Sequence, residues 1–151
     1  MRKFHIFTDL DGTLLGKEDY RYEVNMQLIS DLKFKGIGVS LNTSKTLSET
    51  ECWQHKLGLD SPFIIENGAA ILFPKNKFEL EQLKPHKVES RGRYFCIVLG
   101  MKIESLESLY RPYAEKVTSL IHCPQNEAMS LTGLGGSDLQ RARTREFTLP
   151  L

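Results

Sequence analysis

Apolar and polar residues along the first half of the chain follow the pattern of alternating strands and helices. Three short apolar runs are typical of buried strands, at residues 3–9, 37–41 and 62–66. Two intervening segments repeat apolar residues at helical spacing, at residues 23–35 and 46–57. A fourth strand is expected at 69–73, after the tight-turn dipeptide Asn67-Gly68. This order predicts a doubly wound, Rossmann-like α/β fold with a parallel sheet, whose ligands bind beyond the carboxyl ends of the strands.

The second half of the chain has a different composition. Residues 75–93 are rich in charge and show little periodicity, which is typical of a solvated connector. Beyond them the pattern favours two strands and three helices, the strands at 94–99 and 117–122 and the helices at 103–117, 125–131 and 137–145. Pro112 is expected to weaken the first of these helices. We therefore divide the chain into part of a core at 1–80, a connector at 81–93 and a second unit at 94–151.

Composition excludes several classes of protein. A chain of 151 residues can bury a hydrophobic core that needs no disulfide bonds or structural metal ions to be stable. Twenty Lys and Arg against 19 Asp and Glu leave a net charge of +1, which argues against a nucleic-acid or anionic membrane partner. We find neither a membrane-spanning run nor a secretory signal. The odd, widely spaced set Cys52, Cys96 and Cys123 fits neither a disulfide framework nor a zinc site, so we expect a cytoplasmic protein.

The candidate chemistry lies where the first strand ends. Asp9 and Asp11 stand within the string Phe-Thr-Asp-Leu-Asp-Gly-Thr-Leu-Leu. Carboxylates at the end of an apolar strand are costly unless a cation or a reaction uses their charge, and a hard divalent cation would satisfy them. Asp9 could attack phosphorus, while Asp11 could protonate the leaving oxygen and then activate water. The same residues could also simply cap a turn, so the short pattern alone leaves both interpretations open.

The longer string resembles the first motif of the haloacid dehalogenase superfamily, which consists mostly of magnesium-dependent phosphohydrolases. The resemblance implies that Asp9 is the nucleophile, that Asp11 is the general acid and base, and that both hold Mg²⁺. It also implies that Thr43 binds the transferring phosphoryl group, a role that suits a hydroxyl at the start of a helix. Without the family, Thr43 and Ser44 are equally well explained as residues that begin a helix.

Further strings are similar to the mannosyl-3-phosphoglycerate phosphatases of the Cof-like group, at residues 42–46, 66–71, 131–134 and 145–147. This resemblance implies a small-molecule phosphomonoester substrate, a sugar phosphoglycerate. Lys45 would face the phosphate or carboxylate, or would be an ordinary exposed lysine. Asn67 would hold the substrate or only form a turn. Arg143 and Arg145 would contact the glycerate or phosphate, although arginines on a helix face are more often solvated.

The resemblance implies a fold of haloacid dehalogenase type with the beginning of an α+β cap at 94–151, incomplete at the C-terminus. A third-motif lysine and an acidic fourth motif would lie beyond residue 151, so we expect little or no turnover from this chain alone. The first strand would be left as an open sheet edge that invites self-association or docking of a complementary fragment. Two alternatives stay open, a generic sugar-phosphate phosphatase of the Cof-like group and a non-catalytic remnant or interaction module.

Overall fold

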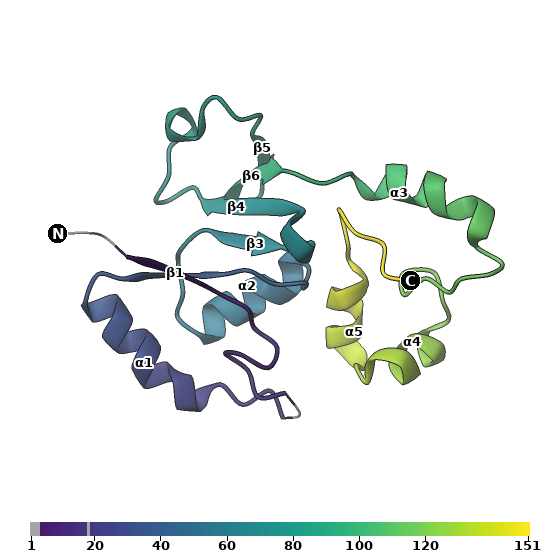
Figure 1. The fold of residues 1–151 in the computed structure, drawn as a ribbon, viewed down its shortest axis with the longest axis horizontal. Coiled ribbons are helices and arrows are strands. Elements are labelled where there is room, and N and C mark those ends of the chain that lie inside the picture. The colour runs from purple at the N-terminus through teal and green to yellow at the C-terminus, as the bar shows by residue number, and fades with distance from the viewer. Residues whose placement is uncertain (1–3, 18) are drawn as a thin grey trace.

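The structure is a computed structural model that describes residues 4–17 and 19–151. Its first two strands form a parallel pair. Strand β1 (His5–Thr8) pairs in parallel with β2 (Gly38–Leu41), and helix α1 (Glu23–Phe34) connects them (Figure 1). These elements confirm the predicted strands and helix. Lys3, the first residue of the predicted strand, lies outside the described residues.

Helix α2 (Leu47–Lys56) leads from β2 to β3 (Phe63–Ile65), and a parallel bridge joins Asn42 to Ile64. The N-cap of α2 is Thr46, whose hydroxyl accepts a hydrogen bond from the Glu49 N–H at 3.3 Å. The Glu49 carboxylate accepts in return from the Thr46 N–H at 2.9 Å, which completes a capping box. The predicted β-α-β-α-β order is therefore confirmed, with both helices in the predicted places.

A second sheet begins with β3 and is antiparallel. The tight turn predicted at Asn67-Gly68 implies this for β3 and the fourth strand, whereas the predicted parallel sheet did not include the later strands. Strands β4 (Ala70–Pro74), β6 (Tyr94–Val98) and β5 (Glu89–Arg91) extend the second sheet in the order β3-β4-β6-β5. Tyr94 and Cys96 are buried in the same core as the parallel strands, because alternate residues of β6 point inward. β6 thus pairs with the sheet although the cap was expected to begin at Tyr94, and β5 lies within the expected connector.

The C-terminal third is mostly helical. Helix α3 (Ile103–Tyr110) ends seven residues before the predicted bound, in a 3₁₀ turn that contains Pro112, the residue expected to weaken it. Helices α4 (Gln125–Thr132) and α5 (Gly136–Arg143) also form where expected. The predicted strand at 117–122 is wrong, because the buried Ser119 has a carbonyl oxygen that accepts from both His122 and Cys123 N–H groups and closes a turn.

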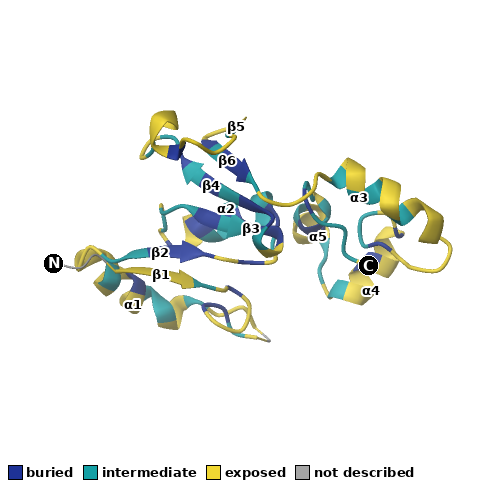
Figure 2. Cartoon of the chain, turned by 45° about the horizontal axis from the view of Figure 1, so that its top comes forward, coloured by how far each residue is buried: buried dark blue, intermediate teal, exposed yellow. Residues whose placement is uncertain are grey.

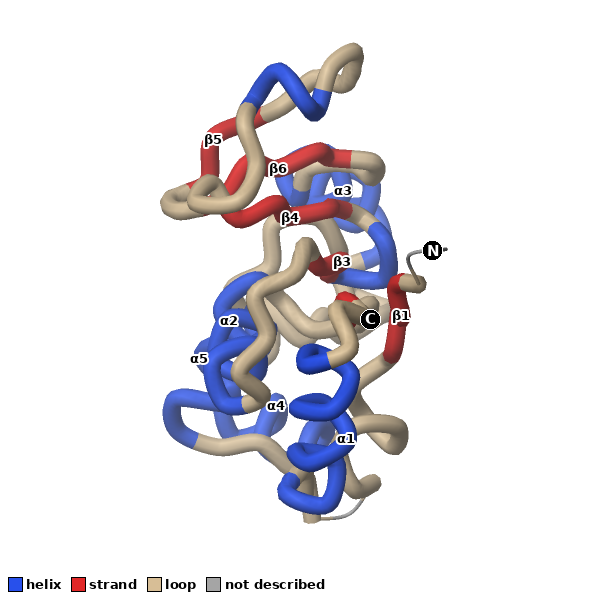
Figure 3. Tube along the Cα trace, turned by 90° about the vertical axis from the view of Figure 1, so that its left-hand side faces the viewer, coloured by secondary structure: helices blue, strands red, loops and turns tan. Residues whose placement is uncertain are grey.

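The main core is built from both ends of the chain. Leu10, Leu41, Phe63 and Ile65 are fully buried, and Phe147 from the C-terminal segment packs among them. Figure 2 shows buried segments on β2, β4 and β6. Seen from the side, β3, β4, β6 and β5 rise in this order above the helices α1, α2, α4 and α5 (Figure 3). The C-terminal segment therefore returns to the region where the parallel strands end. In the described part of the chain, no helix is long and apolar enough to cross a membrane.

Candidate active site

The loop after β1 presents two carboxylates on the surface. Leu10 is fully buried between the exposed residues Asp9 and Asp11. The Leu10 N–H donates to Oδ1 of Asp9 at 2.7 Å, which orients that carboxylate. Gly12 then turns the chain at φ +70°, and the Leu15 N–H returns to the Leu10 carbonyl at 2.8 Å. Burial of the leucines therefore fixes both aspartates at the carboxyl end of β1.

Lys45 connects this loop with the start of α2. Its Nζ lies 3.0 Å from Oδ2 of Asp11 and 3.9 Å from Oε1 of Glu49. The Lys45 side chain is only 11% exposed, and its ammonium also lies over the Tyr20 ring at 5.6 Å. The interpretation of Lys45 as an ordinary exposed lysine does not fit this burial. The structure instead brings the second aspartate and a cation together.

Thr43 and Asn67 hold the loops after β2 and β3 together. The Thr43 N–H donates to the Ile64 carbonyl, and the Asn67 N–H donates to the Thr43 carbonyl, both at 3.1 Å. The Thr43 side chain is buried, and its Oγ1 accepts from the Lys45 N–H at 3.2 Å. Asn67 adopts a left-handed conformation with φ 60°, as a tight turn requires, while its side chain is exposed. The loops after β2 and β3 therefore lie next to each other, close to Lys45.

The two candidate arginines lie in different surroundings. Nη1 of Arg145 donates to the Ser44 carbonyl at 3.1 Å, so this side chain reaches the loop after β2. Nη2 of Arg143 donates instead to the carbonyls of Ile121 and Cys123, at 2.6 and 2.8 Å. Arg143 therefore stabilises the turn before α4 by these two hydrogen bonds. Its expected contact with substrate stays a prediction.

Sequence analysis missed the role of Glu66, which is 1% exposed. Its carboxylate accepts from the N–H groups of Glu146 and Phe147, at 3.0 and 3.1 Å, and from the Thr148 hydroxyl at 2.7 Å. The hydroxyl of Thr46 adds a bond to the Arg141 carbonyl at 2.9 Å. A carboxylate directly after the apolar run 62–65 was the available signal, because buried charges need partners. These bonds dock the C-terminal segment beside the candidate site.

The oxygen donors of the loop after β1 are of the kind that Mg²⁺ prefers. Asp9 and Asp11 offer carboxylate oxygens at an exposed position, where water can complete an octahedral shell. Within residues 4–17 and 19–151, no group of three or more His, Cys, Asp or Glu side chains is arranged to hold a metal ion. A magnesium ion held by these two carboxylates would therefore keep most of its waters.

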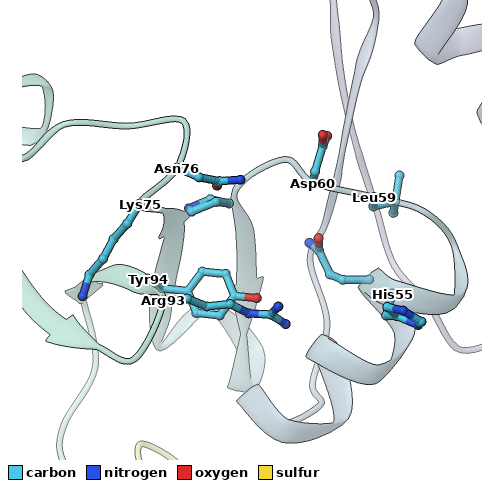
Figure 4. Close-up of a pocket in the computed structure, with 9 residues that line it drawn as sticks. His55, Leu59, Asp60, Lys75, Asn76, Arg93 and Tyr94 are labelled. Atoms are coloured by element: carbon cyan, nitrogen blue, oxygen red, sulfur yellow. The ribbon is translucent and has the colours of Figure 1, made fainter.

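Two cavities are lined by different residues of α2. One of about 370 Å³ lies beside Lys45 and is lined also by Tyr20, Trp53 and Arg141. The other, of about 480 Å³, lies at the amino end of β3 (Figure 4). There burial raises the pKa of Tyr94, and the neighbouring Tyr94 raises the pKa of the Arg93 guanidinium. The first cavity adjoins the candidate site through Lys45, whereas none of the described residues that line the second is a candidate site residue.

The chain matches a known family over most of its length. Residues 6–118 match the family model described as haloacid dehalogenase-like hydrolase. The chain is 36% identical over 149 residues to the glucosyl-3-phosphoglycerate/mannosyl-3-phosphoglycerate phosphatase of Persephonella marina, covering 96% of this chain and 53% of the relative. It is 41% identical over 101 residues to the mannosyl-3-phosphoglycerate phosphatase of Pyrococcus furiosus, covering 67% of this chain and 39% of the relative.

A solved structure has a similar fold. The crystal structure of a hypothetical protein from Geobacillus kaustophilus aligns with a TM-score of 0.59 and 19% sequence identity. The alignment covers 89% of this chain and 50% of that one. The chain thus spans about half the length, or less, of the curated relatives and of the solved structure that it matches.

Proposed function

Because the chain belongs to the haloacid dehalogenase-like hydrolases, we propose that it carries the nucleophile of a phosphomonoester hydrolase of the mannosyl-3-phosphoglycerate phosphatase type. The observation that supports this proposal best is the contact of 3.0 Å between Lys45 and Asp11. It brings the loops after β1 and β2 into one site, as phosphoryl transfer requires. The substrate class follows the names of the relatives, both of which are phosphatases of hexosyl phosphoglycerates.

In the proposed reaction, Asp9 attacks the phosphorus atom of a phosphomonoester. A bond forms between a carboxylate oxygen of Asp9 and phosphorus while the bond from phosphorus to the ester oxygen breaks. Asp11 donates a proton to the leaving oxygen and later takes one from an attacking water. That water displaces inorganic phosphate and restores the Asp9 carboxylate.

The other residues serve the phosphoryl group. Lys45 offsets negative charge beside Asp11, and in the proposed reaction the hydroxyl of Thr43 and the N–H of the exposed residue Ser44 donate hydrogen bonds to phosphoryl oxygens. Arg145 holds the Ser44 carbonyl and thereby positions this loop. A magnesium ion held by Asp9 and Asp11 would neutralise part of the phosphoryl charge.

We propose further that β1 takes part in self-association and that the protein acts in the cytoplasm. Of the described strands, β2 alone pairs with β1, and Phe4 and Phe7 on β1 and its approach are 67% and 63% exposed. An apolar strand edge of this kind favours pairing with another chain. Three free thiols support a reducing compartment, at Cys52, Cys96 and Cys123.

Phosphate release from a panel of phosphomonoesters tests the proposed activity. With mannosyl-3-phosphoglycerate and Mg²⁺, Asp11→Asn should lose about 10²- to 10⁴-fold in rate, and Asp9→Asn should lose more. Asp31→Asn, an exposed position on α1, is the matched control. Where the parent chain releases phosphate measurably, an Asp9→Asn variant of equal activity contradicts the proposal.

A second measurement applies where the parent chain releases phosphate too slowly to follow. Calorimetric titration with Mg²⁺ and beryllofluoride, a phosphoryl mimic, should give heat that disappears in Asp9→Asn. Heat that persists unchanged in that variant would mean adventitious binding and would refute the role of Asp9. The retained response of Asp31→Asn would show that loss of one negative charge is not the cause.

A further inference from the structure

The cavity beside Lys45 has the composition of a site for a neutral, hydroxyl-rich ligand. It lies between the segment 19–23, helix α2 and the α4–α5 region, and its volume of about 370 Å³ lies within the usual range of ligand pockets. Of the described residues that line it, three are aromatic, four are acidic and four are basic. Such a lining offers flat apolar surface together with many donors and acceptors of hydrogen bonds.

The charges of this lining neutralise one another. Lys45 lies 3.9 Å from Glu49, and Arg141 lies 2.5 Å from Asp138. The ammonium of Lys56 lies 4.4 Å from the centre of the Trp53 ring. Because Lys45 and Arg141 already have acidic partners and Lys56 lies against an aromatic ring, the cavity favours a neutral polar molecule over an anion.

Aromatic side chains give this cavity its flat surface. The Trp53 and Tyr22 rings meet edge to face at 5.7 Å, which fixes the orientation of the indole. Tyr20 lies over the Lys45 ammonium and is 42% exposed. A sugar ring has an apolar C–H face, which can pack on the aromatic rings of the lining. It also has a rim of hydroxyls, which can donate hydrogen bonds to the acidic side chains and accept them from the basic ones.

Lys45 places the cavity next to the reacting carboxylates. The same ammonium lines the cavity and contacts Asp11 at 3.0 Å. We infer that this cavity binds the hexosyl group of a hexosyl phosphoester while its phosphate faces Asp9 and Asp11, an inference that rests on the proposed function. The inference assigns the sugar part of the substrate to Trp53, Tyr20 and the Asp138–Arg141 pair.

Trp53 provides the test, because it is the one tryptophan in the sequence. Mannosylglycerate, which lacks the phosphate, should change the fluorescence of the 151-residue chain saturably with a Kd on the order of 1 mM. Glycerate and inorganic phosphate at equal concentrations should leave the spectrum unchanged. A response to glycerate equal to that of mannosylglycerate, or a response to adenosine alone, overturns the assignment to a sugar.

A pair of variants locates the binding. Asp138→Asn should weaken binding of mannosylglycerate by about five- to tenfold, because one charged hydrogen-bonding partner is lost. Asp60→Asn, which makes the same change in the cavity at the amino end of β3, should bind as the parent does. Equal weakening in both variants, or weakening in Asp60→Asn alone, refutes this location.

Thiol protection gives a readout that does not depend on folding of a variant. Cys52 is partly exposed and lines the cavity, whereas Cys96 and Cys123 are buried. Mannosylglycerate should slow alkylation of Cys52 in the parent chain, as monitored by peptide mass spectrometry. Unchanged alkylation at saturating sugar, together with an unchanged Trp53 spectrum, overturns the inference.

Different results would refute the sugar site and the proposed hydrolysis. Asp9→Asn should keep the Trp53 response to mannosylglycerate, because Asp9 does not line the cavity, while it abolishes phosphate release. Phosphate release without a Trp53 response refutes the sugar site and leaves the phosphatase standing. A Trp53 response with phosphate release unaffected by Asp9→Asn refutes the proposed mechanism instead.

Discussion

Removal of the Glu66 charge should release the C-terminal segment from the candidate site. The Glu66 carboxylate is buried and accepts three hydrogen bonds, from Glu146 N–H, Phe147 N–H and the Thr148 hydroxyl. Two of these bonds reach Oε2 and one reaches Oε1. Glu66→Gln keeps the volume of the side chain but replaces one acceptor oxygen by a donor.

The size of the effect follows from these contacts. If the amide oxygen of Gln takes the place of Oε2, its NH₂ group faces the Glu146 N–H, and a partly buried donor is left without an acceptor. That loss costs about 1–3 kcal/mol, and two bonds to a neutral oxygen instead of a charged one cost about 1 kcal/mol more. We therefore expect Glu66→Gln to favour undocking of the segment by about 2–4 kcal/mol.

Hydrogen exchange measures this undocking directly. The amides of Glu146 and Phe147 should exchange about 30- to 1,000-fold faster in Glu66→Gln, the equivalent of 2–4 kcal/mol. Amides of β2 should change much less, because the segment opens while the parallel strands stay paired. Glu115→Gln, at an exposed position, is the control for loss of one charge. Unchanged exchange at Glu146 and Phe147 would refute the role assigned to Glu66.

Three other changes test the fold. Thr46→Ala removes the N-cap and the bond to the Arg141 carbonyl, so it should cost about 2 kcal/mol and lower the Tm by about 4–8 °C. Burial raises the pKa of Cys96 from 9.0 to about 11, so stability should fall between about pH 9 and 11, by about 2–3 kcal/mol relative to Cys96→Ala in denaturant titrations. Phe7→Lys on β1 should lower the average molar mass measured by light scattering at high protein concentration towards that of the monomer. A molar mass identical to that of the parent protein at every concentration contradicts association through this strand edge.

The sign of the Cys96 effect follows from linkage. The folded state holds its thiol proton up to a higher pH than the unfolded state does, so the neutral thiol stabilises the fold fully below pH 9. This contribution is lost as the pH rises through the folded pKa of about 11. A wild-type protein that loses no more stability than Cys96→Ala over this range would contradict the burial of the thiol.

Local patterns predicted the elements that position the candidate site. Helices α1 and α2 follow directly from apolar spacing, and each begins and ends within one residue of its predicted bounds. Because the parallel strands end where Asp9 and Thr43 begin their loops, the topology alone brings the loops after β1 and β2 to the same end of this strand pair.

Contacts between distant residues decided the features that local patterns did not predict. Strand β5 consists of Glu89, Ser90 and Arg91, which lack any apolar alternation and become a strand by pairing with β6. The predicted strand at 117–122 fails for the opposite reason, since its apolar residues are folded back by the turn at Ser119. The docking bond of Glu66 spans 80 residues, so helical and strand periodicity carried no information about it.

The C-terminal part of the chain connects the cavity beside Lys45 with the buried carboxylate of Glu66, and this connection can be tested. Asp138 and Arg141 line the cavity, and the segment 146–148 that Glu66 binds follows closely along the chain. If undocking also moves α5, Glu66→Gln should weaken the Trp53 response to mannosylglycerate, although Glu66 itself does not line the cavity. In the double variant with Asp138→Asn the two losses should then be less than additive, because a displaced α5 no longer presents Asp138. Strictly additive losses would show that Glu66 holds the segment without shaping the sugar site.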